Sequence, residues 1–228
     1  MKLIAIETST EACSAALLID NEVVESYRLA PRQHTELILP MLDELLAQAE
    51  LARSQLDAVA FGRGPGAFTG VRIATGVAQG IAFALDIPVA PVSTLAALAH
   101  GAWRERGDNL IASAIDARME ELYWGCYQIE GSGLAILRGE ELVCTPQRVT
   151  LPPGAGWFGA GSGWGPYGVT LQAQLGASLS GYQAERFPHA YDIALLGATL
   201  WQAGQAVSAD AALPVYLRDQ VVQKKAPD

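Results

Sequence analysis

Several features that would point to a particular class of protein are scarce in this sequence of 228 residues. It contains three cysteines, Cys13, Cys126 and Cys144, which lie far apart and show no paired spacing. Its three histidines are equally scattered. The sequence therefore predicts neither a disulfide framework nor a metal site.

Long apolar runs are missing too. No uninterrupted stretch of about 18 apolar residues occurs, so we expect no membrane span. The apolar segment 3–6 is too short for the core of a signal peptide. We therefore expect a cytoplasmic protein without membrane contacts.

Positive charge is in short supply, with 15 Lys and Arg against 24 Asp and Glu and a formal net charge of −9. Phosphate contacts need Lys and Arg, so a chain this acidic is a poor nucleic-acid binder by itself. If the function involves nucleic acid, we expect a partner to hold it.

What the sequence does contain is enough apolar material for a core, because half of its residues are hydrophobic. The length suits one large domain or two small ones. The chain is organised around residues 56–85, which predict a buried strand at 58–61, a glycine-dense turn at 62–70 and a long helix at 71–85.

One face of this predicted helix carries almost no side chain. Arg72, Gly76, Gly80 and Ala84 fall four residues apart, and each interior glycine costs a helix about 1 kcal/mol relative to alanine. Something must therefore approach the backbone closely. It is either this chain's own sheet or a neighbouring helix, or a partner chain.

A second predicted helix, 34–49, has an unusually wide apolar face. Its large apolar residues fill an arc of roughly 200°, against about 100° for an ordinary surface helix. The helix is therefore either sandwiched within its own domain or shared between its own sheet and a partner.

The rest of the sequence predicts an α/β fold in which the same arrangement of strands and helices occurs twice along the chain. Strands are expected at 3–6, 12–19 and 22–29, and 58–92 forms a strand–helix–strand unit, which implies a parallel pair. From residue 110 the plan starts again, with strands at 110–115 and 122–129. We place a boundary between residues 1–105 and 106–228.

The glycine turn does not match two familiar phosphate-binding patterns. A P-loop would place Lys-Ser or Lys-Thr after the glycines, where Phe68 and Thr69 stand. A dinucleotide fingerprint fits superficially, but Pro65 stiffens the turn and Asp86 precedes the next strand instead of ending it. The hydroxyl-rich segment 7–11 is either an ordinary hairpin turn or a phosphate cradle.

Residues 64–73 read GPGAFTGVRI, which resembles the GPGSFTGxRxG segment of the TsaB family of bacterial tRNA threonylcarbamoyladenosine biosynthesis proteins. The resemblance covers nearly the whole chain, because other family segments are matched in the same order at 4–10, 34–40, 91–98, 115–118 and 214–218.

The resemblance implies an actin/hexokinase-like (ASKHA) fold of two related subdomains, each a mixed sheet with flanking helices. It also implies a cytoplasmic, accessory subunit for tRNA modification that dimerises with the catalytic paralogue TsaD and supports docking of the ATPase TsaE. Contact with tRNA would be indirect, and the chain alone would form a homodimer through the same surface. The implied partner-binding residues lie on the two unusual helices: Leu37, Ile38, Met41, Leu42, Leu45, Arg72, Gly76, Gly80 and Phe83.

The same comparison argues against a catalytic role. Thr94 and Leu98 stand where the catalytic paralogue has two metal-binding histidines, and leucine cannot bind a metal. Glu7 replaces the aspartate that is usual at the first phosphate loop. We expect no metal and at most weak ATP or ADP binding, for which the candidate residues are Thr8, Ser9, Gly64, Gly66 and Asp116. The alternatives are an active small kinase or metallohydrolase of the same fold and, more remotely, an NAD enzyme.

Overall fold

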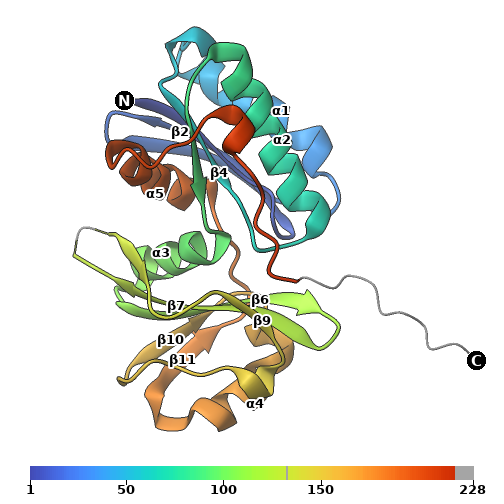
Figure 1. The fold of residues 1–228 in the computed structure, drawn as a ribbon, viewed down its shortest axis with the longest axis vertical. Helices are drawn as coiled ribbons and strands as arrows, with labels where there is room; N and C mark the ends of the chain where they lie inside the picture. The colour runs from blue at the N-terminus through green and yellow to red at the C-terminus, as the bar shows by residue number, and fades with distance from the viewer. Residues whose placement is uncertain (132, 219–228) are drawn as a thin grey trace, which may run out of the picture.

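The computed structural model describes residues 1–131 and 133–218 and contains two mixed sheets, one above the other in Figure 1. Residues 219–228, the end of the predicted second subdomain, lie outside the described part of the chain.

The first sheet has the strand order β3-β2-β1-β4-β5. β1, β2 and β3 pair antiparallel, whereas β4 and β5 continue the sheet parallel to β1. β1 and β4 read as short continuous apolar runs because both of their faces are buried. The bounds are β1 Lys2–Glu7, β2 Ala12–Ile19, β3 Glu22–Leu29, β4 Ala58–Gly62 and β5 Val89–Val92.

Helices cover both faces of this sheet. α1 (His34–Gln48) and α2 (Phe68–Leu85) lie on one face, and Figure 1 shows them side by side. α5 (Ala190–Gln202) covers the opposite face, where it packs on β1, β2, β4 and β5. Each face therefore carries its own apolar core.

The second sheet repeats this plan, as the sequence predicted. Its order is β11-β10-β6-β7-β8, with an antiparallel β6–β7 hairpin and with β10 and β11 parallel to β6. β9 also pairs with β7, and α4 (Trp164–Leu175) lies on one face. The bounds are β6 Leu110–Arg118, β7 Glu121–Ile129, β8 Ala135–Leu137, β9 Leu142–Cys144, β10 Trp157–Ala160 and β11 Leu179–Gln183.

One helix from each half of the sequence packs on the sheet of the other half. α3 (Thr94–Arg106) follows the first sheet in the chain but packs mainly on β6 and β7 of the second. α5 follows the second sheet but covers the first, and α3 and α5 also contact each other. The predicted boundary at 105/106 falls at the end of α3, so it separates the two sheets but not the helices that cover them.

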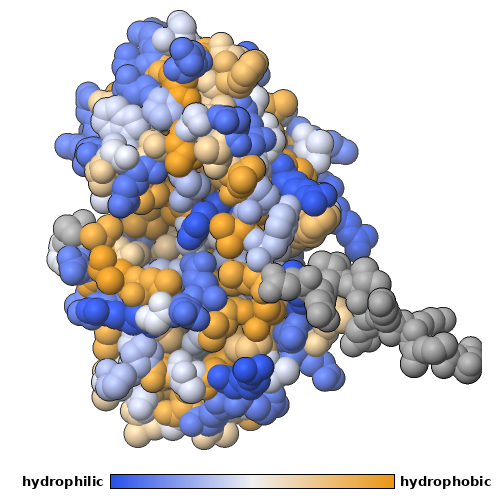
Figure 2. Space-filling view, viewed as in Figure 1, coloured by the Kyte–Doolittle hydropathy of each residue, from blue (hydrophilic) through white to orange (hydrophobic). Residues whose placement is uncertain are grey.

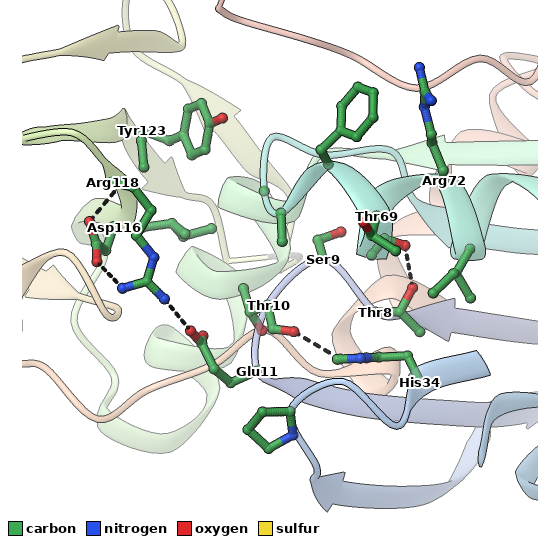
Figure 3. A pocket seen from close by; sticks show the side chains of 18 of the residues that line it. Thr8, Ser9, Thr10, Glu11, His34, Thr69, Arg72, Asp116, Arg118 and Tyr123 are labelled. Atoms are coloured by element: carbon green, nitrogen blue, oxygen red, sulfur yellow. Dashed lines mark hydrogen bonds and ion pairs between the residues drawn. The ribbon is translucent and has the colours of Figure 1, made fainter. Parts of the chain in front are cut away.

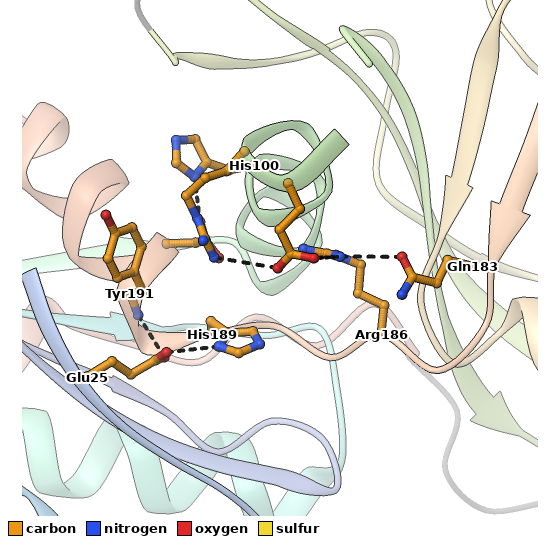
Figure 4. A network of polar contacts seen from close by, with 9 residues as sticks. Glu25, His100, Gln183, Arg186, His189 and Tyr191 are labelled. Carbon is orange, nitrogen blue, oxygen red and sulfur yellow. Dashed lines mark hydrogen bonds and ion pairs between the residues drawn. The ribbon is translucent and has the colours of Figure 1, made fainter. Parts of the chain in front are cut away.

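A polar network joins α3 to α5 (Figure 4). The carboxylate of Asp192, at the start of α5, accepts hydrogen bonds from His100 Nδ1 (2.7 Å) and Arg104 Nε (3.1 Å). Burial alone would raise the pKa of Asp192, but the hydrogen bonds and the charge interactions with His100 and Arg104 together outweigh it and hold the pKa below its usual value.

The network continues to the first sheet and to the second. Arg186, in the connection between β11 and α5, is buried and donates to Glu105 Oε2 of α3 at 2.6 Å and to Gln183 Oε1 of β11 at 3.4 Å. His189 Nδ1 lies 2.9 Å from Glu25 Oε2 on β3. The network therefore ties together segments that are far apart in the sequence.

By length and composition alone, α2 is apolar enough to cross a membrane, although polar residues interrupt its apolar sequence. Only 33% of its residues, among them Val71, Ala74 and Ala78, are buried, and this inner side packs against the sheet. The apolar character of α2 is therefore weak evidence for a membrane segment.

Candidate functional site

A cleft of about 1090 Å³ opens where the two halves meet (Figure 3). Five segments border it: the turn between β1 and β2, the β3–α1 connection with the start of α1, the glycine segment with the N-terminal part of α2, the β6–β7 hairpin and the C-terminal residues 215–218. The polar lining residues include Thr8, Ser9, Thr10, Glu11, Arg32, His34, Thr69, Arg72, Asp116, Arg118 and Arg218.

The glycine segment lies directly against the β1–β2 turn. The Ala67 N–H donates to the Ser9 carbonyl at 2.7 Å, and the Thr8 hydroxyl donates to the Gly70 carbonyl at 2.7 Å. A Cβ on Gly66 would overlap the Ser9 carbonyl, and one on Gly70 would overlap that of Thr8. These glycines therefore serve close backbone packing within the protein.

Glu7 lies beneath this turn and is completely buried. Its carboxylate accepts a hydrogen bond from the Ser9 N–H and a long one, 3.4 Å, from the Thr94 hydroxyl. A Cβ on Gly62 would overlap this carboxylate. Burial raises the pKa of Glu7 to about 6, although the hydrogen bonds from Ser9 and Thr94 oppose the shift.

The β1–β2 turn leaves the side chains of Thr8 and Ser9 little access to the phosphate group of a nucleotide. Thr8 and Ser9 have no exposed surface, and the Ser9 N–H, which a phosphate would need, is taken by Glu7. Thr8 and Ser9 border the cleft, but their side chains are buried and the Ser9 N–H is occupied, so nucleotide binding at these two residues stays a prediction.

Of the other three nucleotide candidates, two line the same cleft as Thr8 and Ser9 and one does not. Gly64 is buried with a φ of 97°, its carbonyl accepts the Thr94 N–H at 3.0 Å, and it is not part of the cleft lining. Gly66 and Asp116 do line the cleft, but the Asp116 carboxylate is paired with Arg118 at 2.9 Å.

The residues at the predicted histidine positions of the catalytic paralogue are buried. The Thr94 hydroxyl lies 3.2 Å from Ser9 Oγ, and Leu98 is part of the core beside the second sheet. Within residues 1–131 and 133–218, no group of three or more His, Cys, Asp or Glu side chains could hold a metal.

Charged residues bridge the two halves across the cleft, and sequence reasoning missed them. Arg118, at the end of β6, binds Glu11 of the β1–β2 turn at 3.2 Å. Arg218 donates to the Ala117 carbonyl at 3.1 Å and pairs with Glu121. Segments 115–118 and 214–218 stood out as motifs, but nothing in the sequence showed that they meet.

The bare column of α2 faces away from the described chain. Gly76 and Gly80 are exposed, and a Cβ on either would meet nothing within 4 Å. Phe83, on the same side, is 84% exposed. The interpretation that this chain's own sheet or helices require the glycines is therefore wrong.

Arg72 continues this column at its N-terminal end. Its guanidinium stacks over the Phe68 ring at 3.7 Å, and its Nε donates to the Tyr216 hydroxyl at 2.9 Å.

In the space-filling view, apolar residues also reach the surface around the middle of the molecule, where the halves meet (Figure 2).

The wide apolar face of α1 is mostly accounted for by its own core. Ile38, Met41, Leu42 and Leu45 are all less than 5% exposed, because α1 packs on β2 and also contacts α2. These four predicted partner-binding residues are corrected to core residues. Leu37 is half-buried, and Leu39 next to it is exposed.

Comparison with known proteins gives consistent matches over the whole chain. The family described as TsaD, tRNA N6-adenosine threonylcarbamoyltransferase, matches residues 21–223. The chain is 40% identical to the tRNA threonylcarbamoyladenosine biosynthesis protein TsaB of Escherichia coli, covering 100% of this chain and 99% of that protein. It is 39% identical to TsaB of Haemophilus influenzae, covering 100% and 98%.

A solved structure is similar in both sequence and fold. YeaZ from Pseudomonas aeruginosa superposes with a TM-score of 0.89 at 51% sequence identity, covering 95% of this chain and 99% of that one.

Proposed function

Because the chain belongs to the TsaB family of tRNA threonylcarbamoyladenosine biosynthesis proteins, we propose that it is an accessory, noncatalytic subunit of a threonylcarbamoyltransferase. It docks on a TsaD homologue, and the pair supports docking of a TsaE homologue. Its contact with tRNA is indirect, and it works in the cytoplasm.

The observation that carries this proposal is the exposed face of α2, formed by Arg72, Gly76, Gly80 and Phe83, which we call the α2 face. Two glycines in the helix interior cost stability, and no described part of this chain requires them. A helix backbone left bare in this way allows a partner helix to approach closely. The exposed ring of Phe83 provides an apolar anchor of the kind that dominates binding energy at interfaces.

The proposed mechanism is structural. Burial of the α2 face stabilises the active arrangement of the partner and completes the surface on which the ATPase docks. A stable pair would bury about 1,600 Å². Without the partner, two copies of this chain associate through the same face, because a two-fold contact reuses one patch.

The noncatalytic assignment is supported by the residues at the two positions that would need histidines and by the β1–β2 turn. Leucine occupies the second of the two positions that would need histidines, and Thr94 is committed to Ser9 and Glu7. In the β1–β2 turn the Glu7 carboxylate occupies the Ser9 N–H, which is then not available to a phosphate.

The test is pair formation with the TsaD homologue of the same organism, measured by sedimentation velocity, together with reconstituted threonylcarbamoyl transfer. Replacing Gly76 and Gly80 by leucine should weaken pairing at least tenfold and abolish stimulation, because two large side chains then stand between the helices. The isolated variant should remain folded, since both positions face open space.

Gly165→Leu is the matched control, because Gly165 is an exposed glycine of α4, away from the α2 face. It should leave pairing and transfer unchanged. Undiminished pairing of the Gly76/Gly80 double variant would refute the α2 face. Nucleotide hydrolysis by the chain alone would instead favour an active kinase or metallohydrolase of this fold.

A further inference from the structure

The cleft gathers arginines although the chain as a whole is acidic. Arg32, Arg72, Arg118 and Arg218 line it, and they come from the β3–α1 connection, α2, β6 and the C-terminal segment. Two carboxylates, Glu11 and Asp116, line the same cleft. The lining is therefore locally positive in a chain of net charge −9.

The backbone at this cleft is held in an unfavourable conformation. Among the described residues, seven non-glycine residues have a left-handed φ, and four of them lie in or next to the cleft. Arg118, Met119 and Glu120 do so in succession, with φ of 62°, 55° and 61°, and Arg32 has a φ of 67°. Such conformations persist where surrounding contacts hold them, and they concentrate at functional sites.

Two hydrogen bonds hold the tip of the β6–β7 hairpin in this conformation. The Arg118 N–H donates to Asp116 Oδ1 at 2.9 Å, and Arg218 binds the Ala117 carbonyl at 3.1 Å. This geometry aims the Arg118 side chain, which is 74% exposed, across the cleft toward Glu11 (Figure 3).

The anions already bound by these arginines are carboxylates. Arg118 binds both Asp116 and Glu11, and Arg218 binds Glu121. The Glu11 side chain is 40% exposed, so a carboxylate from another molecule could replace it without unfolding either half. Arg32 makes no ion pair with the described residues.

We propose that this cleft binds a short acidic peptide segment of the partner that docks on the α2 face. The inference rests on the proposed function, because Phe68 and Arg72 both line the cleft and begin the exposed side of α2. A partner seated on α2 would therefore meet the cleft at the N-terminal end of that helix. Its acidic side chains would pair with Arg32 and Arg118, and the latter would release Glu11.

Charge and shape favour a peptide over other anions. A long nucleic acid would be repelled by a chain of net charge −9, whereas a short segment of a few carboxylates contacts only the positive lining. A nucleotide would need backbone N–H groups at the β1–β2 turn, where Glu7 already takes that of Ser9.

The test uses the full-length chain and fluorescently labelled hexaglutamate, with anisotropy measured at about 50 mM and 300 mM salt. Hexaglutamine, hexauridylate and ADP are the comparison probes. We expect hexaglutamate to bind at low salt and hexaglutamine not to bind. Arg32→Glu and Arg118→Glu should each weaken hexaglutamate binding at least tenfold, whereas Arg138→Glu, an exposed arginine away from the cleft, should change it less than twofold.

The proposal for the α2 face and the proposal for the cleft can be refuted independently of each other. The Gly76/Gly80 double leucine variant should lose pairing with the partner but keep hexaglutamate binding. Absence of hexaglutamate binding to the wild-type chain, or equal binding to the Arg32 and Arg138 variants, would overturn the proposal. Tighter binding of hexauridylate or ADP than of hexaglutamate would also overturn it, by assigning the cleft to nucleic acid or to a nucleotide.

Discussion

Glu7 and Gly62 show how a single pair of residues decides what the cleft can hold. The missing side chain of Gly62 makes room for the Glu7 carboxylate, and that carboxylate takes the Ser9 N–H of the turn. A buried anion of the protein itself thus stands where a bound anion would need its donors.

The position of Glu7 predicts a specific dependence of stability on pH. The pKa of Glu7 is raised from 4.5 to about 6 by burial, so the folded state binds its proton more tightly than the unfolded state does. This group therefore makes stability fall as the pH rises from about 4.5 to about 6, and above that range the charged carboxylate costs about 2 kcal/mol.

Glu7→Gln should remove this penalty, because glutamine keeps the acceptor for the Ser9 N–H without the charge. We expect the free energy of unfolding at pH 7.5 to rise by up to about 2 kcal/mol, and its slope between pH 4.5 and 6 to flatten. Urea denaturation across that pH range measures both. An unchanged slope would show that Glu7 is not the group responsible.

At the scale of elements, the polar contact between α3 and α5 depends on one buried carboxylate. Asp192 is fully buried and binds His100 and Arg104 of α3. Removing one member of a buried charged pair leaves the others without compensation, which typically costs 3–5 kcal/mol.

Asp192→Ala should therefore lower the free energy of unfolding by about 3–5 kcal/mol at neutral pH, as measured by urea denaturation. Asp108→Ala is the control, because Asp108 forms a more exposed ion pair with Arg106, and it should cost less than about 1 kcal/mol. Equal effects of the two substitutions would contradict a structural role for the α3–α5 network.

Elements with clear periodicity were predictable from sequence, and irregular ones were not. β2 and β3 have the predicted bounds, because strands that alternate or run apolar between turn residues are easily read. α4 and β11 were missed: α4 begins at Trp164-Gly165-Pro166, and glycine and proline there read as a loop.

The candidate site was less accessible to sequence reasoning than the fold. The spacing of apolar residues along α1 predicted a wide apolar arc. It did not show that the chain's own domain would cover Ile38 and Met41. The column of α2 was read correctly as bare, because glycine spacing is local. The contacts that Arg118 makes with Glu11, and that Arg218 makes with the β6–β7 hairpin, depend on how the two halves are oriented relative to each other. No local sequence pattern encodes that orientation.

At the scale of the whole molecule, the C-terminal segment 215–218 straps the two halves together. The Val215 N–H donates to the Arg63 carbonyl of the first half at 2.8 Å, and Arg218 binds the β6–β7 hairpin of the second. Figure 1 shows this segment running down past α2 to the level of β6.

Arg218→Ala should loosen the hairpin that this strap holds. It removes one hydrogen bond to the Ala117 carbonyl and one ion pair with Glu121, and bonds of this kind contribute about 1.5–3 kcal/mol each at most. Hydrogen exchange of the Arg118 and Glu121 amides should accelerate at least tenfold. Arg138→Ala should leave these amides unaffected, and unaltered exchange in Arg218→Ala would show that the strap does not restrain the hairpin.

The exchange of α3 and α5 between the halves has a consequence for biosynthesis. When the first five strands have emerged from the ribosome, the helix that covers one face of their sheet is still to be translated. At 5–20 residues per second, that apolar face waits on the order of ten seconds for α5. The nascent chain should therefore need shielding by a chaperone during this interval, and neither half should fold when expressed as a separate fragment.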